Sequence, residues 1–421
     1  MTRQDRRPYR PATGATNLDA MLQATVPHPG ALAPSRDERP APNPRPARRR
    51  LLRELEHPRD VVAHLGPNWF STVMGTGIVG GAAASLPVRF PGLTAFATVV
   101  WGLAALLLVA LVAAWGVHWV RHTETARGHA ADPVMAQSYG AVAMAVMTVG
   151  AGAVLLGPPV LGTTTAVAVS GTLWAIGTVL GLATAVGVPY LMIIRHEVRD
   201  DAVSGAWLMP VVPPMVSAAD GALLIPHLAA GTARTTMLLA CTAMVGAAVL
   251  ATLALLPQIW RRLVVHGTGP AAAVPTTWIV LGPLGQSITA VNLLGTQAAG
   301  ALPEPYATGA AVLGLLYGVP VWGFAVIWLA LAAAVTLRTA RRGLPFSLTW
   351  WSFTFPVGTL VTGTSALAAR VPLPALDVAA IALYLLLVAA WALVAVRTVH
   401  GGLVRGHLFA GPTAAPTVHL R

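Results

Sequence analysis

The stretch WWSFTFPVGT, residues 350–359, places two tryptophans, two phenylalanines, a proline and a glycine inside a long apolar part of the chain. Proline interrupts the hydrogen-bond ladder of a helix, and hydroxyl side chains have no partners in hydrocarbon. Both are tolerated in a membrane where helices enclose a water-filled path. The stretch therefore indicates a membrane protein whose helices surround such a path.

The composition of the chain supports a membrane location. Of 421 residues 55% are hydrophobic and 10% are charged, whereas soluble proteins contain about 25% charged residues. Apolar runs of about 20 residues, long enough to span a bilayer, recur from residue 68 onward. We expect an all-α integral membrane protein with ten spans, at 68–86, 93–120, 133–156, 166–194, 205–228, 237–263, 276–299, 308–337, 344–369 and 375–396.

Two polar tails flank the apolar region, which we place at 65–399. Residues 1–60 are rich in proline, arginine, alanine and glycine, and we expect a disordered, basic cytoplasmic tail. Residues 400–421 form a second, short cytoplasmic tail. The first fifty residues contain no apolar segment of the kind found in cleavable signal peptides. We therefore expect the first span to direct the chain to the plasma membrane.

Arginines mark a repeat. Every second span ends in one, at intervals of about 60–80 residues, which predicts five helical hairpins. The loops after these spans hold nine arginines and the opposite loops hold three. Because basic residues collect on the cytoplasmic side, both termini should lie in the cytoplasm. The net charge of +12 then reflects membrane topology, and we expect the lipid bilayer, not nucleic acid, as a partner.

The two kinds of span differ in composition. The even-numbered spans are mostly leucine, alanine and valine, whereas the odd-numbered spans contain glycine, serine, threonine, glutamine, asparagine and proline. Their polar residues recur every three or four positions, so they share one helix face. This pattern predicts an inner ring of odd-numbered helices around a path, although small and polar residues also join helices to one another. The residues that we expect to line the path are Ser71, Gly75, Gln137, Met144, Pro214, Ser217, Gln286, Thr289, Asn292, Thr354, Gly358 and Thr362.

Asp220 is an acidic residue well inside an expected span. Such residues are costly in a membrane, by about 2.5–3.5 kcal/mol on insertion scales, and often serve a function. Asp220 can border the path and couple transport to protons, or it can bond to a neighbouring helix; both interpretations stay open.

Other motifs carry no chemistry. GTGIVG at 75–80 fits the dinucleotide fingerprint, but no strand precedes it. The chain has no metalloprotease, serine-hydrolase or Walker signature, and its single cysteine, Cys241, lies in an apolar span. We therefore expect no cofactor, no metal site and no catalytic residue. An intramembrane enzyme remains a distant alternative.

Five segments resemble one known family. PNWFSTVMGTGIV (67–79), DPVMAQSYGAVAMAVMTVGAG (132–152), WLMPVVPPMVSAADGALL (207–224), TTWIVLGPLGQSITAVNLLG (276–295) and WWSFTFPVG (350–358) are similar to the tellurite-resistance/dicarboxylate transporter family. That family includes TehA, plant guard-cell slow anion channels, the yeast malic-acid permease and fungal sulfite efflux pumps. The resemblance spans about residues 65–399 and occurs in all five odd-numbered spans.

The resemblance implies ten helices as five hairpins around a central pore, in each subunit of a homotrimer. It also implies that a phenylalanine of the ninth helix closes the pore. The TFP pattern assigns this role to Phe355, with Phe353 as the alternative. One departure is Phe70-Ser71, where TehA and the plant channels have a Phe-Gly pair. The sequence MGTGI is more similar to the sulfite-efflux branch of the family than to TehA.

The expected depth of Phe355 agrees with a gate. The residue follows Gly343 by twelve positions, or roughly 18 Å at about 1.5 Å per residue, near the middle of a core of about 30 Å. We also expect Pro356 to break the helix beside it. The predicted function is a transporter or channel for small anions such as sulfite or a C4-dicarboxylate, for example malate. The alternative is a proton-coupled anion or tellurite-resistance exporter that uses Asp220.

Overall fold

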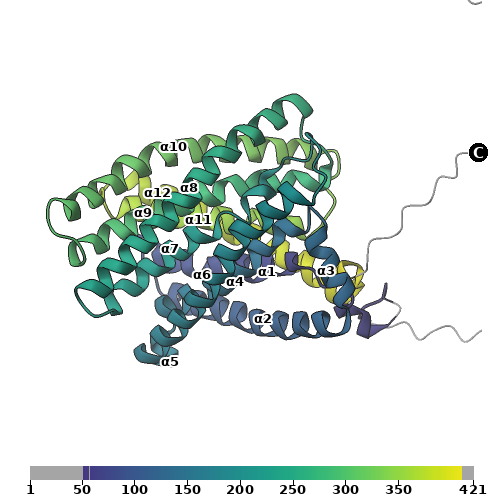
Figure 1. Cartoon of the computed structure of the whole chain (residues 1–421), viewed down its shortest axis with the longest axis horizontal. Helices are drawn as coiled ribbons and strands as arrows, with labels where there is room; N and C mark the ends of the chain where they lie inside the picture. Colours follow the sequence, from purple (N-terminus) through teal and green to yellow (C-terminus); the bar gives the residue numbers. More distant parts are fainter. Residues whose placement is uncertain (1–50, 56, 410–421) are drawn as a thin grey trace, which may run out of the picture. The chain divides into compact units, whose positions relative to one another are not determined.

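A computed structural model describes residues 51–55 and 57–409, which contain helices and no strand. The α-helices are α1 (Phe70–Ser85), α2 (Leu93–Arg121), α3 (Thr123–Ala131), α4 (Tyr139–Leu156), α5 (Pro158–Leu161), α6 (Thr163–Ile194), α7 (Pro213–Leu224), α8 (Thr232–His266), α9 (Leu281–Gln297), α10 (Tyr306–Ala340), α11 (Phe355–Ala368) and α12 (Pro374–Val399). Figure 1 shows them along the chain. The all-helical class predicted from the sequence is confirmed for the described residues.

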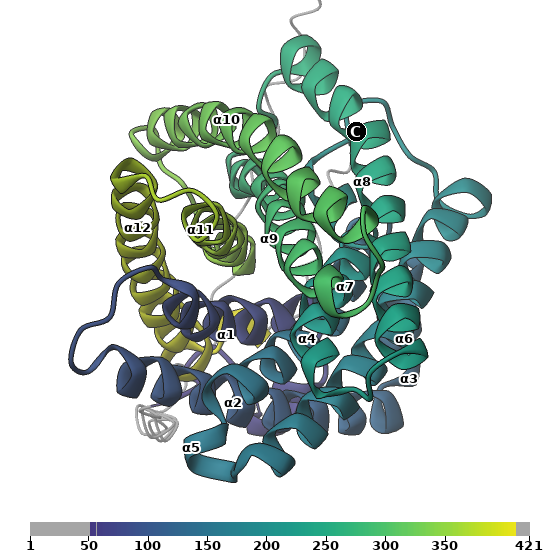
Figure 2. The same ribbon diagram turned by 90° about the vertical axis from the view of Figure 1, so that its left-hand side faces the viewer.

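Five helices, α1, α4, α7, α9 and α11, form an inner ring. Each packs against the next, and α11 returns to α1, so the ring is closed. Each inner helix also packs against the long helix that follows it, α2, α6, α8, α10 or α12 respectively. Figure 2 shows these five outer helices around the inner ones.

Burial distinguishes the two groups of helices. Nearly every residue of the inner helices is buried, whereas the outer helices expose large apolar side chains such as Val120 and Ile193, each 82% exposed. Exposed apolar side chains over the length of a helix are expected where lipid is the solvent. The chain is therefore a multi-pass membrane protein.

The structure contains seven helical segments that are long and apolar enough to cross a membrane, within the residues it describes. They are Leu93–Arg121, Ala136–Leu156, Thr163–Ile194, Thr232–His266, Ala271–Gly300, Tyr306–Ala340 and Pro374–Arg405. The ten expected spans include three more, whose α-helical parts α1, α7 and α11 have only 16, 12 and 14 residues.

The inner helices are short because each follows a 3-10 segment. These segments are η2 (Pro67–Trp69), η3 (Ala136–Ser138), η4 (Gly205–Leu208), η6 (Ala271–Val280) and η8 (Leu348–Phe353). Pro356 lies in the first turn of α11, where the missing N–H of proline costs nothing. The expectation that Pro356 breaks a helix is therefore wrong; it helps to begin one.

The remaining short elements precede or follow the longer helices along the chain. They are η1 (Pro58–Val62), η5 (Ile225–His227), η7 (Ala298–Gly300), a π-helix η9 (His400–Arg405) and η10 (His407–Phe409).

The described ends of the chain pair with each other. The Leu52 N–H donates to the Leu403 carbonyl at 3.0 Å, and Arg405 Nε lies 2.7 Å from Glu54 Oε1. The Phe409 ring stacks on Trp69 of η2 with a centroid distance of 4.5 Å. Residues 51–55 and 400–409, which we assigned to tails, thus pack on the helical region. The rest of both predicted tails lies outside the described residues.

Candidate functional site

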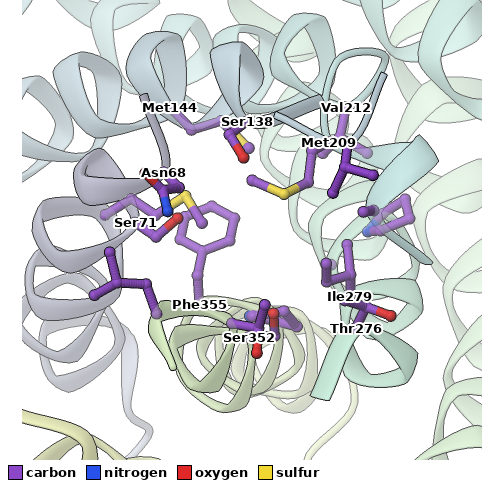
Figure 3. A pocket seen from close by; sticks show the side chains of 18 of the residues that line it. Asn68, Ser71, Ser138, Met144, Met209, Val212, Thr276, Ile279, Ser352 and Phe355 are labelled. Carbon is purple, nitrogen blue, oxygen red and sulfur yellow. The ribbon is translucent and has the colours of Figure 1, made fainter. Parts of the chain in front are cut away.

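A cavity of about 260 Å³ lies where the five inner helices begin. Each inner helix contributes residues from its first turns or from the segment that precedes it. The lining residues are Asn68, Ser71, Met74, Val134, Met135, Ser138, Met144, Ala206, Met209, Val212, Thr276, Ile279, Gly282, Pro283, Leu348, Thr349, Ser352, Phe355 and Pro356. Figure 3 shows the cavity from close by.

Among the described residues that line the cavity, none has an ionisable side chain. Its polar groups are hydroxyls and one amide, and the thioethers of four methionines add polarisable surface. Five helix N-termini meet at the cavity, and each carries a partial positive charge from the helix dipole. An anion therefore meets favourable partial charges there, without a fixed cation that would hold it tightly.

The C-terminal ends of outer helices surround the same end of the inner ring. Trp278 of η6 donates its indole N–H to Thr336 of α10 at 2.8 Å, and Trp351 of η8 donates to Thr398 of α12 at 3.0 Å. Arginines cluster at these ends; the Arg397 guanidinium lies 5.7 Å from the centre of the Trp350 ring. A basic rim of this kind raises the local concentration of anions.

Phe355 projects into the cavity. Its ring extends from the start of α11 into the middle of the opening, toward Met144 and Ser138 (Figure 3). Phe353 has other neighbours: its ring packs on Trp278 at 5.2 Å and on Trp350 at 5.7 Å, and it does not line the cavity. Of the two candidate rings, only Phe355 is placed where it can obstruct a path.

Ser71 and Met144 also line the cavity. Five other predicted residues, Gly75, Thr289, Thr354, Gly358 and Thr362, lie at or next to the contacts of α11 with its neighbours. The space beside Gly75 is filled by the Thr354 hydroxyl and the Trp351 ring, and the space beside Gly358 by Ile78. The hydroxyls of Thr289 and Thr362 are 2.7 Å apart and join α9 to α11.

Three predicted residues bond to outer helices. The Gln137 amide donates to Met192 Sδ of α6 at 3.1 Å, the Ser217 hydroxyl is 2.5 Å from that of Thr178 in α6, and the Asn292 amide donates to a carbonyl of α10 at 3.1 Å. These hydrogen bonds agree with the alternative that the polar residues join helices to one another. Pro214 and Gln286 are buried and do not line the cavity.

Asp220 lies outside the cavity lining, on α7 where α7 packs against α8. It is 8% exposed, and its Oδ2 atom has no hydrogen-bond partner among the described residues. The next residue, Gly221, faces Cys241 of α8. The structure thus separates Asp220 from Phe355 and the other cavity residues.

The sequence did not identify the lining residues contributed by the 3-10 segments and nearby turns, such as Asn68, Met209, Thr276 and Ser352. The polar stripes were counted at α-helical spacing, and 3-10 segments follow a period of three. A proline near the start of each odd-numbered span, accompanied by a tryptophan in all but the span at 133–156, is the available signal.

The chain matches known membrane transport proteins over most of its length. Residues 64–399 match the family model described as SLAC1, voltage-dependent anion channel. An uncharacterized transporter of Methanocaldococcus jannaschii is 26% identical over 85% of this chain and 100% of its own length. A sulfite efflux pump of Trichophyton rubrum is 29% identical over 80% of this chain and 91% of its own, and that of Arthroderma benhamiae is 28% identical over the same shares.

The family match covers more than half of the chain and confirms the resemblance carried by the five odd-numbered segments. This protein therefore belongs to the SLAC1 family, whose members are membrane transporters and channels for anions.

Proposed function

We propose that this protein carries small anions along the path enclosed by its inner helices, and that the Phe355 ring gates this path. The observation that carries the proposal is the neutral cavity at which five helix N-termini meet. Oriented dipoles favour an anion over a cation, and weak sites release the ion again. Arginines at the rim add long-range attraction.

The proposed membrane arrangement is ten spans in five hairpins, with α1, α7 and α11 each crossing together with their 3-10 extensions. The packing of each inner helix on the next outer helix supports the hairpins. We further propose a homotrimer in the plasma membrane with both termini in the cytoplasm. The arginine distribution supports the orientation, and the family resemblance is the basis for the trimer.

Sulfite is the substrate that we place first, because two of the relatives are sulfite efflux pumps. A C4-dicarboxylate such as malate is the second candidate. The cavity offers no arginine that would pair with a second carboxylate, which favours the smaller anion.

The proposal is tested by flux into proteoliposomes. The fluxes of sulfite, malate, nitrate and chloride are compared in parallel with that of potassium. We expect at least one anion to move faster than potassium. Empty liposomes and liposomes with heat-inactivated protein provide the baselines. A potassium flux above that of every anion would overturn the proposal.

Proton-coupled export through Asp220 is the second candidate. The unpartnered, buried Oδ2 atom is the observation in its favour, and the distance of Asp220 from the cavity lining is against it. Asp220→Asn keeps the shape of the side chain and removes the proton site. If coupling uses Asp220, this variant loses the pH dependence of transport at normal protein levels; an unchanged pH profile assigns the carboxyl to packing.

A further inference from the structure

A second cavity, of about 210 Å³, lies between the C-terminal halves of α8 and α10. We call it the α8–α10 groove; its walls are Trp260, Leu263 and Val264 of α8 and Trp328, Leu331 and Val335 of α10. The two helices belong to the outer ring (Figure 2). The groove opens on the outer surface, since Trp260 and Val264 are 47% and 72% exposed. Its side chains are almost entirely apolar.

Two tryptophans form one end wall of the groove. The Trp260 and Trp328 rings are 5.8 Å apart between centroids. Trp328 is 1% exposed and donates its indole N–H to the Thr277 carbonyl at 2.9 Å, whereas Trp260 is 47% exposed, and no acceptor faces its N–H in the described structure. Trp260 therefore offers an apolar ring and an indole donor near the C-terminal end of α8, the combination that tryptophan brings to membrane interfaces.

The groove lies behind the wall of the anion cavity. Thr277 of η6 lines the groove, and its neighbour Thr276 lines the cavity. A small hollow of about 20 Å³, bordered by both threonines and Leu263, lies between the two. A molecule in the α8–α10 groove would therefore contact η6, and η6 also forms part of the wall of the cavity that contains Phe355.

Two arginines follow the groove residues along the chain at the end of α10. Arg338 follows Val335 by one turn on the same face of α10, and Arg342 lies in the turn that ends the helix. Both side chains are exposed and make no ion pair among the described residues. The carboxylate of Asp201, whose backbone carbonyl accepts from Arg262 of α8 at 3.0 Å, is paired with Arg199 at 2.8 Å.

We propose that the α8–α10 groove binds one anionic glycerophospholipid, with an acyl chain against Trp260 and Trp328 and the phosphate at Arg338 and Arg342. The apolar walls match an acyl chain, and the unpaired arginines match a negatively charged headgroup. A zwitterionic lipid would supply the same chain and no net charge.

The test uses quenching of Trp260 fluorescence by brominated lipids in reconstituted protein. The Trp260 signal is the difference between the wild type and Trp260→Phe, which isolates this ring from the other tryptophans. We expect brominated phosphatidylglycerol to quench it more than brominated phosphatidylcholine at equal mole fraction. The ratio of the apparent affinities for phosphatidylglycerol and phosphatidylcholine should fall by about fivefold in Arg338→Gln and by about fivefold in Arg342→Gln.

Arg195→Gln is the matched control, because Arg195 is an exposed arginine that ends α6, away from the groove. It should keep the full preference for the anionic lipid. All of these arginines and Trp260 are on the surface, so the variants should fold. Equal quenching by both lipids, or a preference that survives loss of both arginines, would overturn the proposal. A Trp260 that neither lipid quenches would mean that a second subunit covers the groove, which overturns it equally.

Discussion

Phe353 and Phe355 are two residues apart and have different surroundings. The first packs among tryptophans, and the second faces the cavity. Phe353 ends the 3-10 segment η8 and Phe355 begins α11. Two residues advance by about 200° in an α-helix and by about 240° in a 3-10 helix, so in either geometry the two rings point in different directions. At the residue scale, this difference decides which side chain can act as a gate.

The first prediction is that Phe355→Ala raises anion flux well above that of the wild type, because the ring that obstructs the path is gone. Proteoliposome flux, normalised to folded protein, measures it. If the ring only packs, the truncation costs about 3–5 kcal/mol of stability and flux falls with the amount of folded protein.

Phe353→Ala is the control for this prediction. It removes a ring from the tryptophan cluster and should lower stability without opening the path. Higher flux from Phe353→Ala and none from Phe355→Ala would show that the gate was assigned to the wrong ring. Lower flux from both at normal protein levels would argue against any phenylalanine gate.

The second prediction concerns His129, on α3 outside the spans. Burial lowers the pKa of the His129 ring, and the His118 and His64 rings add to this effect, while Asp132 opposes it. The unfolded chain therefore binds more protons below about pH 6.5, so stability is present above that pH and is lost as pH falls toward the folded pKa. We expect the thermal midpoint to drop between pH 7.5 and 5.5.

His129→Gln should reduce that drop, because glutamine does not titrate. His266→Gln, at an exposed position, serves as the control and should behave as the wild type. A drop of unchanged size in the His129 variant would contradict the prediction.

The sequence predicted the elements better than their internal structure. Apolar runs located the long helices that can span a membrane, because burial in lipid requires length and composition alone. The 3-10 segments could not be predicted, since they depend on how the first turns of neighbouring helices meet. For the same reason the sequence predicts Ser71, Met144 and Phe355, which line the cavity, but not Thr276 and Ser352, which line it as well.

At the element scale, the contact of α9 with α11 depends on Gly285. A Cβ atom there would meet the Thr359 and Leu360 backbone of α11, while a Cβ at Gly282 on the same helix would meet no atom within 4 Å. The third prediction is that Gly285→Ala lowers the stability of the protein by about 1–3 kcal/mol, the usual cost of overpacking. Gly282→Ala should be neutral or slightly stabilising. Thermal midpoints in detergent compare the two, and equal midpoints would contradict the close approach.

At the scale of the whole molecule, the proposed topology predicts which loops reach each side. Cys241 is the single cysteine of the chain, so a Cys241→Ala background offers no reactive thiol. We expect Ala229→Cys, in the exposed loop before α8, to react with a membrane-impermeant maleimide in intact cells. Ala340→Cys, at the end of α10, should react only after permeabilisation. The reverse pattern would invert the proposed orientation.

The closed inner ring also constrains how the protein is made. Helix α1 packs against α11 and α12, and Trp391 of α12 donates its indole N–H to Thr76 of α1 at 3.2 Å. During synthesis α1 enters the membrane first, and the helices that cover this side of it emerge roughly 300 residues later, after about 15 s or more at ribosomal speed. Until then, Thr76 and the glycines of α1 must face lipid or the insertion machinery. A ribosome that stalls before α11 therefore leaves an unsealed helix bundle in the membrane, which quality-control proteases can recognise by its exposed polar face.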